Sequence, residues 1–136
     1  MEKRMCITTN DYQRLVGLVE FAGLRNKNSE ITDRLIKELK VARMLPQDEI
    51  SNAIVTMNSR VSVKDLSSGR TTELTITYPQ DADNRELKVS VFSSIGVALL
   101  GCQEGDIASW RIPSGIGRFK VLKVIYQPEA AGHYYL

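Results

Sequence analysis

A change in hydrophobic period near residue 57 constrains the fold of this chain more than any other sequence feature. Before it, apolar residues recur every three to four positions, as in an amphipathic helix; after it, apolar and polar residues alternate, as in a strand. Helices followed by strands indicate an α+β fold. We therefore expect a short antiparallel helical hairpin (coiled coil) over residues 1–45 and a sheet-based domain over residues 54–136.

The first part predicts two helices. Thr8, with Asp11 three positions later, forms a variant of the capping box that satisfies free N–H groups at a helix start. Ser29 is the expected N-cap of the second helix. The two apolar stripes comprise Tyr12, Leu15, Val16, Val19 and Ala22, and then Ile31, Leu35, Ile36, Leu39 and Ala42. A hairpin this short is marginally stable alone, so we expect it to pack against the rest of the chain.

The second part predicts four or five antiparallel strands with one short helix between them. Residues 44–56 are expected to be a connector, and the strands are expected over residues 59–66, 70–78, 86–92, 107–112 and 118–126. The run "SIGVALLG", residues 94–101, is too rich in Ala and Leu for a strand and predicts a helix capped by Ser93 or Ser94. Side chains on that helix are expected to fill the concave face of the sheet: Ile95, Ala98, Leu99 and Leu100.

The composition is that of a globular protein without a membrane span. The chain has 136 residues, of which 43% are hydrophobic and 25% charged. It contains no run of about 18 apolar residues, and no apolar stretch of the signal-peptide type follows its basic N-terminus. Cys6 and Cys102 are too few and too far apart for a disulfide framework, so we expect reduced thiols and a cytoplasmic protein.

The charge distribution is too even to indicate a particular partner, and nucleic-acid binding is not inferred from it. The formal net charge is +2, and residues 46–136 hold nine Lys and Arg against ten Asp and Glu. Two aromatic residues, Trp110 and Phe119, stand beside cations in expected strands. Neighbours in a strand point to opposite faces, so we expect these rings in the core and Arg111 and Lys120 in solvent.

No catalytic, nucleotide-binding or metal-binding pattern is recognisable. His133, the single histidine, has no nucleophile motif beside it and is expected to be an exposed tail residue. The acidic residues Asp81, Asp83 and Glu86 lack the spacing of a calcium loop and are expected to be solvated. No glycine pattern matches a phosphate-binding loop. We expect no enzyme activity, no cofactor and no bound metal.

The tip of the expected hairpin lies around Leu24 to Asn28. Its residues include Arg25, Asn26, Lys27 and Asn28, so its charged groups are basic. A tip that held Mg²⁺ would need one or two carboxylates. The sequence therefore argues against metal-assisted chemistry at this tip.

The stretch "SSIGVALLGCQEGD", residues 93–106, resembles the Ser-Pro-Ile-x-x-Ala-Leu-(Leu/Ile)-Gly-x-x-x-Gly-Asp element of the C-terminal domain of bacterial Gre transcript-cleavage factors. Together with "ND", "IVTMNSRVSVKDL", "YPQ" and the ending "YQPEAAGHYYL", it resembles the Rnk branch (regulator of nucleoside diphosphate kinase) of the GreA/GreB transcription elongation factor family. The resemblance covers residues 54–136 in order, whereas the helices match by pattern.

The resemblance implies an FKBP-like antiparallel sheet wrapped around a short helix, and a bacterial factor that binds RNA polymerase near its secondary channel. The Rnk type has a shortened coiled coil without the acidic tip by which Gre factors promote RNA cleavage. The short arms and basic tip of this chain fit that type. The resemblance implies competition with Gre factors and no cleavage stimulation. A short apolar hairpin stripe could self-associate, but we expect a monomer, with no membrane partner and no direct sequence-specific nucleic-acid binding.

The docking loop of Gre factors corresponds by motif position to Ser93, Ser94 and Ile95. Ser94 stands where the family has proline, which predicts a looser loop. Ile95 is equally expected as a core residue, and capping is as well supported as partner contact for the two serines.

Two alternative functions remain open from the sequence. An FKBP-like fold is compatible with a peptidyl-prolyl isomerase, which needs a hollow lined by aromatic residues. The candidates for such a lining are Tyr78, Phe92, Trp110, Phe119 and Tyr126. The second alternative is a binding module for another protein, such as nucleoside diphosphate kinase.

Overall fold

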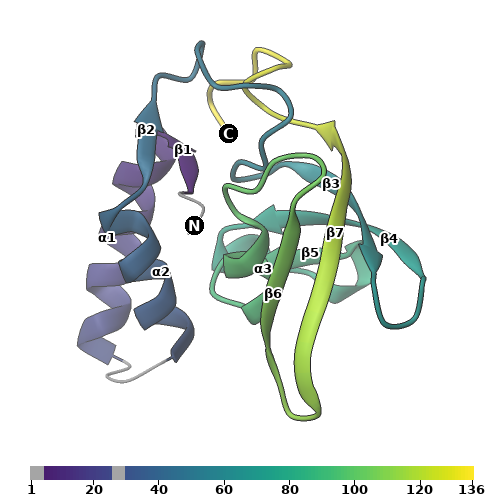
Figure 1. Ribbon diagram of the computed structural model, residues 1–136. Helices are drawn as coiled ribbons and strands as arrows, with labels where there is room; N and C mark the ends of the chain where they lie inside the picture. Colours follow the sequence, from purple (N-terminus) through teal and green to yellow (C-terminus); the bar gives the residue numbers. More distant parts are fainter. Residues whose placement is uncertain (1–4, 26–29) are drawn as a thin grey trace.

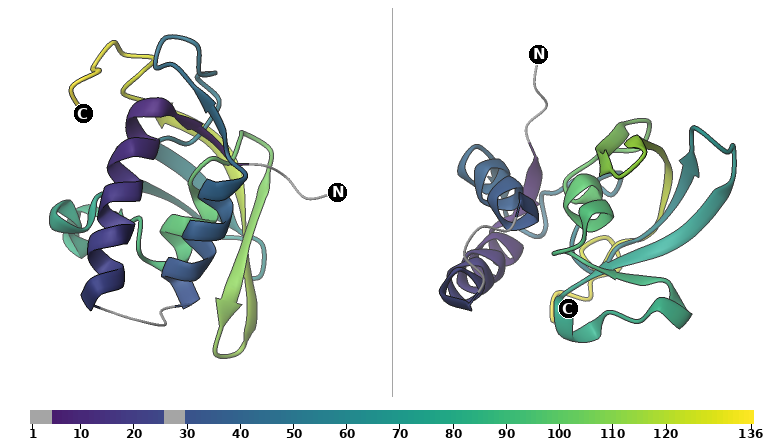
Figure 2. Two further views of the ribbon diagram at one scale, coloured as in Figure 1. Left: turned by 90° about the vertical axis from the view of Figure 1, so that its left-hand side faces the viewer. Right: turned by 90° about the horizontal axis from the view of Figure 1, so that it is seen from below.

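The computed structural model of the protein describes residues 5–25 and 30–136. Two helices lie beside a curled sheet (Figure 1). Both predicted helices are present: α1 spans Thr9–Arg25 and α2 spans Glu30–Lys40. The two helices, which we call the helix pair, lie side by side in all three views (Figures 1 and 2).

The start of α1 is capped as predicted. Thr8 Oγ1 accepts a hydrogen bond from the backbone N–H of Asp11 at 3.0 Å, which satisfies one of the N–H groups left free at a helix start. Leu15 of α1 and Leu35 of α2 are fully buried. The predicted cap of α2, Ser29, lies outside the described residues.

A small sheet ties the two ends of the helix pair together. Strand β1, Cys6–Thr8, precedes α1, and strand β2, Arg43–Leu45, follows α2. The two strands pair in parallel, with Ile7 opposite Met44. The prediction that residues 44–56 form only a connector is wrong at residues 44 and 45, because strands of three residues are too short to show an alternating pattern.

The main sheet has the strand order β5-β4-β3-β7-β6. Its strands are β3 (Arg60–Asp65), β4 (Thr71–Thr77), β5 (Lys88–Ser90), β6 (Ile107–Ile112) and β7 (Gly115–Tyr126). All neighbours are antiparallel except β4 and β5, which are parallel, so the prediction of a wholly antiparallel sheet is wrong at this edge. The connection before β5 contains two 3₁₀ turns, η1 (Pro79–Asp81) and η2 (Asn84–Glu86), which shorten β5 relative to the predicted strand.

Helix α3, Ser94–Leu99, packs inside the curl of the sheet, as the right panel of Figure 2 shows. Its buried side chains include Ala98, Leu99 and the adjoining Leu100, as predicted. Ile95 is only half-buried at the edge of the core, and Val97 takes the interior position instead. The prediction that Ile95 fills the concave face is therefore only partly right. In this short helix the buried face includes Val97, and Ile95 lies at its edge.

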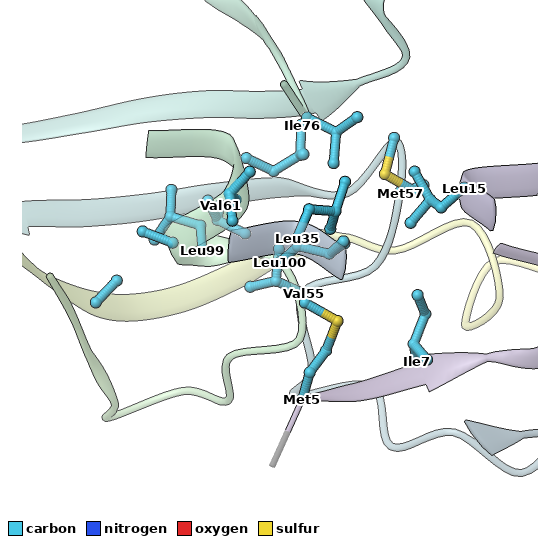
Figure 3. Packing of buried hydrophobic residues seen from close by; sticks show 14 of the residues in the cluster. Met5, Ile7, Leu15, Leu35, Val55, Met57, Val61, Ile76, Leu99 and Leu100 are labelled. Carbon is cyan, nitrogen blue, oxygen red and sulfur yellow. The ribbon is translucent and has the colours of Figure 1, made fainter. Parts of the chain in front are cut away.

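One hydrophobic core joins the helix pair to the sheet domain. Figure 3 shows residues of both parts in one cluster, including Ile7 and Leu15 from the first part and Met57, Ile76 and Leu99 from the second. The helix pair is thus packed against the sheet domain, as its short length required. None of the described helices is long and apolar enough to cross a membrane.

The C-terminal tail departs from its prediction. His133 is half-buried, and its Nδ1 lies 2.7 Å from Tyr126 Oη, so the expectation of an exposed tail histidine is wrong. The tail folds back as hydrogen-bonded turns, in which the N–H of His133 donates to Pro128 O. A glycine with positive φ, Gly132, permits this turn.

Other predictions about single residues are confirmed. Asp81, Asp83 and Glu86 are exposed, and Asp83 caps η2. Trp110 and Phe119 form an edge-to-face pair with ring centroids 4.9 Å apart, packed against the core, whereas their neighbours Arg111 and Lys120 are exposed. Both cysteines are free thiols.

Candidate functional site

The segment before α3 is closed by its own hydrogen bonds; we call residues 90–95 the α3 turn. Ser93 Oγ donates to Ser90 O at 2.6 Å and accepts from the N–H of Gly96 at 3.1 Å. Ser90 Oγ accepts from the N–H of Phe92 at 3.0 Å. Ser93 is therefore the N-cap of α3, one of the two residues predicted for that role.

Gly96 permits the close approach that shapes the α3 turn. A Cβ atom at this position would overlap the backbone carbonyl oxygen of Ser90. Because any side chain would push these two segments apart, the sequence needs glycine here. The turn is thus held by its own contacts, with Ser94 at the position where the family pattern has proline.

The three predicted docking residues lie together at this turn. Ser93, Ser94 and Ile95 are all half-buried, and Ile95 packs against the core from its edge. Ser94 is the first residue of α3, which is the position where a proline is favoured in a helix. The arrangement presents small polar groups and one aliphatic side chain on a rigid turn, without a titratable group.

The predicted hairpin tip is described only at its edge. Arg25 is the last residue of α1, while Asn26, Lys27 and Asn28 lie outside the described residues. The tip therefore stays a prediction from the sequence.

A second site, missed by sequence reasoning, joins the helix pair to the sheet domain; we call it the joint. Asp11 is 1% exposed, and its Oδ2 accepts a hydrogen bond from the backbone N–H of Met57 at 3.1 Å. Its Oδ1 lies 3.4 Å from the hydroxyl of Tyr78, which donates to it. In a capping box this acid bonds back to the cap residue; here the side chain also reaches across to Met57 and Tyr78 in the other part of the chain.

The C-terminal tail completes the joint. Glu129 is buried, and its Oε1 accepts from Thr56 Oγ1 at 2.7 Å. Thr56 Oγ1 also lies 2.8 Å from Ser59 Oγ. Three stretches that mark the family resemblance, "ND", "TMNS" and "YQPEAAG", thus meet at one place. The available sequence signal for the joint was the presence of polar residues in these three stretches, which are far apart in the chain.

The electrostatics of the joint favour a protonated Asp11. Burial raises the pKa of Asp11 to about 7, and the nearby Glu129 adds to the rise. The hydrogen bond from Met57 and the charge of Arg14 lower the pKa in part. Asp11 therefore changes charge near neutral pH, and the hydrogen bonds of the joint are formed with a group that titrates there.

An open groove of about 830 Å³ separates α2 from α3 and β6. Charged side chains of both signs line it, among them Glu30, Asp33, Arg34 and Lys37. Arg34 Nη1 bridges the two sides by donating to Ser109 O at 3.0 Å. The groove holds no constellation of nucleophile and base, and in the described parts of the chain no group of three or more His, Cys, Asp or Glu could hold a metal ion.

The aromatic residues do not line either of two grooves on the described surface. Tyr78 is buried in the core, and Trp110 and Phe119 pack on each other. Neither the groove beside α2 nor a second of about 600 Å³ along β4 and β5 is lined by an aromatic side chain. These grooves therefore give no support to prolyl isomerisation.

Comparison with known proteins agrees with this architecture. Residues 50–126 match the family model for the C-terminal domain of the transcription elongation factors GreA and GreB. The regulator of nucleoside diphosphate kinase of Escherichia coli (strain K12) is 39% identical over 130 residues, which are 93% of this chain and 92% of that protein. GreA of Alkaliphilus oremlandii is 34% identical over 108 residues, which are 77% of this chain and 68% of that protein.

A solved structure extends the likeness to the whole fold. The GreA/GreB elongation factor from Nitrosomonas europaea has a TM-score of 0.75 and 33% sequence identity, with 92% of this chain and 100% of that chain covered. The sheet domain matches the family model, and the likeness to the regulator includes the helix pair. The chain therefore belongs to the GreA/GreB family of transcription elongation factors, in the branch of the regulators of nucleoside diphosphate kinase.

Proposed function

We propose that this protein binds bacterial RNA polymerase near its secondary channel and regulates transcription there without catalysing a reaction. Family membership supports this proposal, and the α3 turn is the observation that carries it. That turn is preformed by hydrogen bonds among Ser90, Phe92, Ser93 and Gly96, so docking through Ser93, Ser94 and Ile95 would require little ordering of the backbone.

The two parts of the chain have separate roles in this proposal. The sheet with α3, within residues 54–136, is an FKBP-like docking domain, and the helix pair, within residues 1–45, is a shortened coiled coil. Helix α1 has 17 residues, which is about 25 Å at 1.5 Å per residue. The joint at Asp11 fixes the direction of the coiled coil, and the protein acts as a cytoplasmic monomer.

The absence of transcript cleavage follows from the charge near the tip. Residues 24–28 contain no carboxylate, and Mg²⁺ is held mainly by carboxylates and water. The acids at the start of α2, Glu30 and Asp33, line the groove toward the sheet domain together with Arg34 and Lys37. In this groove the two acids lie among cations of the protein itself.

A transcript-cleavage assay tests both halves of the proposal. Backtracked elongation complexes would be incubated with this protein, with a Gre factor, and with both. We expect no cleavage above the polymerase's own rate with this protein alone, and inhibition of Gre-stimulated cleavage that depends on its concentration. Stimulated cleavage would contradict the non-catalytic role, and an unchanged Gre response would contradict competition.

Binding to nucleoside diphosphate kinase is a second candidate. It is favoured by the name of the Escherichia coli relative, a regulator of nucleoside diphosphate kinase. Sedimentation of the purified protein with purified kinase tests it. A stable complex with kinase, together with no binding to polymerase, would replace the first candidate.

A further inference from the structure

The outer face of the main sheet carries a concentration of cations that the fold does not explain. This face points away from α3 and from the helix pair, as the right panel of Figure 2 shows. Side chains that alternate with the buried residues of β3, β6 and β7 lie on it. Its exposed cations are Lys64, Arg111, Arg118, Lys120 and Lys123.

The cations of the outer face are not paired with the described acids of the sheet domain. Residues 46–136 contain nine Lys and Arg and ten Asp and Glu, yet the five cations of the outer face have no ion pair within the described residues. Three acids beside these strands have other partners. Glu73 pairs with Arg60 at 2.7 Å, Asp65 Oδ1 accepts from Ser67 Oγ at 2.7 Å, and Glu104 Oε2 accepts from the N–H of Val124 at 2.9 Å.

One pair of these cations opposes the stability of the sheet. Lys64 on β3 and Lys120 on β7 are direct cross-strand partners, and both are exposed. Like charges directly opposite each other on a sheet are destabilising. Arg118 lies two residues from Lys120 on the same face of β7 and increases the repulsion. An external anionic partner would relieve it.

Aliphatic side chains lie among the cations. Ile116 is 64% exposed and is the cross-strand partner of Arg111. Leu122 is also exposed on β7. Exposed apolar groups beside charges are typical of protein interfaces, and they contribute nothing to phosphate binding.

The face lacks what single-stranded nucleic acid requires. Bases stack on exposed aromatic rings. Of the aromatic residues of β6 and β7, Trp110 and Phe119 pack against the core on the opposite face. Tyr126, at the end of β7, is half-buried, and its hydroxyl lies 2.7 Å from His133 Nδ1. A broad sheet face also does not enter a groove of duplex DNA as a helix or a two-stranded ribbon does. Charge and apolar character together therefore favour an acidic protein surface.

We propose that the outer face of the main sheet is a second docking surface, which binds an acidic, aliphatic surface of RNA polymerase. The inference rests on the proposed function and deepens it, because it adds a contact on the side of the domain away from the helix pair. Charge complementarity steers the approach, and Ile116 and Leu122 bury apolar area in the complex.

Charge reversal tests this surface. The probe is bacterial core RNA polymerase, titrated into labelled protein at two salt concentrations. We expect Lys64→Glu with Lys120→Glu to weaken binding by about tenfold or more at low salt, because two attractive charges become repulsive toward an acidic partner. The control reverses one exposed cation of the sheet domain that lies away from this face, Arg85→Glu, and is compared with Lys64→Glu alone. It should change affinity by about twofold or less, because its charge lies outside the proposed surface.

A single substitution separates binding from folding. Lys64→Glu alone replaces a repulsive cross-strand pair with an attractive one, so we expect a higher urea midpoint together with weaker polymerase binding. A lower midpoint with weaker binding would overturn the inference, because loss of fold would then explain the result. Ile116→Ser, at a highly exposed position, should weaken binding with an unchanged midpoint.

The outcomes distinguish this inference from the proposed function. If wild type and the double charge reversal bind polymerase equally, the inference alone is overturned. If the wild type does not bind polymerase, the proposed function fails and the inference with it. Fluorescein-labelled single-stranded RNA and duplex DNA are the remaining probes. Saturable binding of either by wild type, abolished in the double reversal, would identify nucleic acid as the occupant and overturn the protein partner.

Discussion

The starts of α1 and α3 are capped by the same chemistry, but the two caps have different structural roles. Thr8 Oγ1 accepts from the N–H of Asp11 at 3.0 Å, and Ser93 Oγ accepts from the N–H of Gly96 at 3.1 Å. Around Ser93 the remaining bonds are local and the segment stays half-exposed. Around Thr8 the chain is buried, and Asp11 reaches Met57. A cap with local partners makes a rigid surface, whereas a cap next to a buried acid makes a joint between parts.

The largest effect on stability is expected at Gly96, where the α3 turn leaves no room for a side chain. Gly96→Ala places a Cβ atom against the backbone oxygen of Ser90, so we expect a loss of about 3 kcal/mol in the free energy of unfolding. Gly17→Ala is the matched control, because nothing lies within 4 Å of that position in α1. It should gain up to about 1 kcal/mol from helix propensity. Urea unfolding measures both, and equal effects would contradict the close approach.

The joint gives the next largest effect. Asp11→Ala leaves the buried N–H of Met57 without its acceptor, which costs about 2 kcal/mol. Asp11→Asn keeps an acceptor oxygen and should cost less than half as much. The two variants are compared by urea unfolding at pH 7. If alanine and asparagine were equivalent, the hydrogen bond across the joint would not matter to stability.

Removal of the cap of α3 at Ser93 is expected to have a smaller effect on stability. Ser93→Ala removes the acceptor for Gly96 and the donor to Ser90, at a cost of about 1 kcal/mol. Because the turn is the proposed docking surface, polymerase binding should fall by more than the loss of folded protein explains. Binding measured without denaturant, where the variant is still folded, separates loss of the docking contact from loss of folded protein.

The joint also predicts a pH dependence. The pKa of Asp11 is about 7 in the folded protein, above its ordinary value of 3.8. The folded state therefore holds the proton more tightly than the unfolded state, so this contribution to stability is complete below about pH 4 and is lost as the pH rises toward 7. Unfolding experiments over this range should show the decline in wild type and a reduced decline in Asp11→Asn. Equal slopes would mean that Asp11 titrates normally.

The smallest effect concerns the proline of the family pattern. Ser94 is the first residue of α3, where proline is compatible with helix geometry. Ser94→Pro should therefore stabilise the fold by about 0.5 kcal/mol and tighten polymerase binding slightly. A weaker complex from an equally stable variant would show that the Ser94 hydroxyl itself contacts the partner.

Short-range patterns were sufficient to predict much of the fold. The two helices, the strands around Val61 and Leu74 and the short helix after Ser93 follow from periodicity and capping. The parallel pairings were not predictable in this way. Strands β1, β2 and β5 have three residues each, and such short strands are defined by their partners rather than by their own pattern.

The residues of the candidate site also fall into two groups, those that short-range patterns could predict and those that they could not. Ser93, Ser94 and Ile95 are neighbours in the sequence, so their grouping could be predicted. Asp11 and Glu129 are 118 positions apart, and their environment depends on how the tail folds back over Thr56. Likewise, the face shared by Lys64 and Lys120 requires the register between β3 and β7.

The most direct measurement is the binding of labelled protein to bacterial core RNA polymerase, followed by competition with an unlabelled Gre factor. The account predicts saturable binding at micromolar concentrations or below, and complete displacement by the competitor. Binding that the Gre factor fails to displace would place the protein away from the secondary channel. No binding at micromolar concentrations would contradict the central claim, with Ser94 as the first residue to restore to proline.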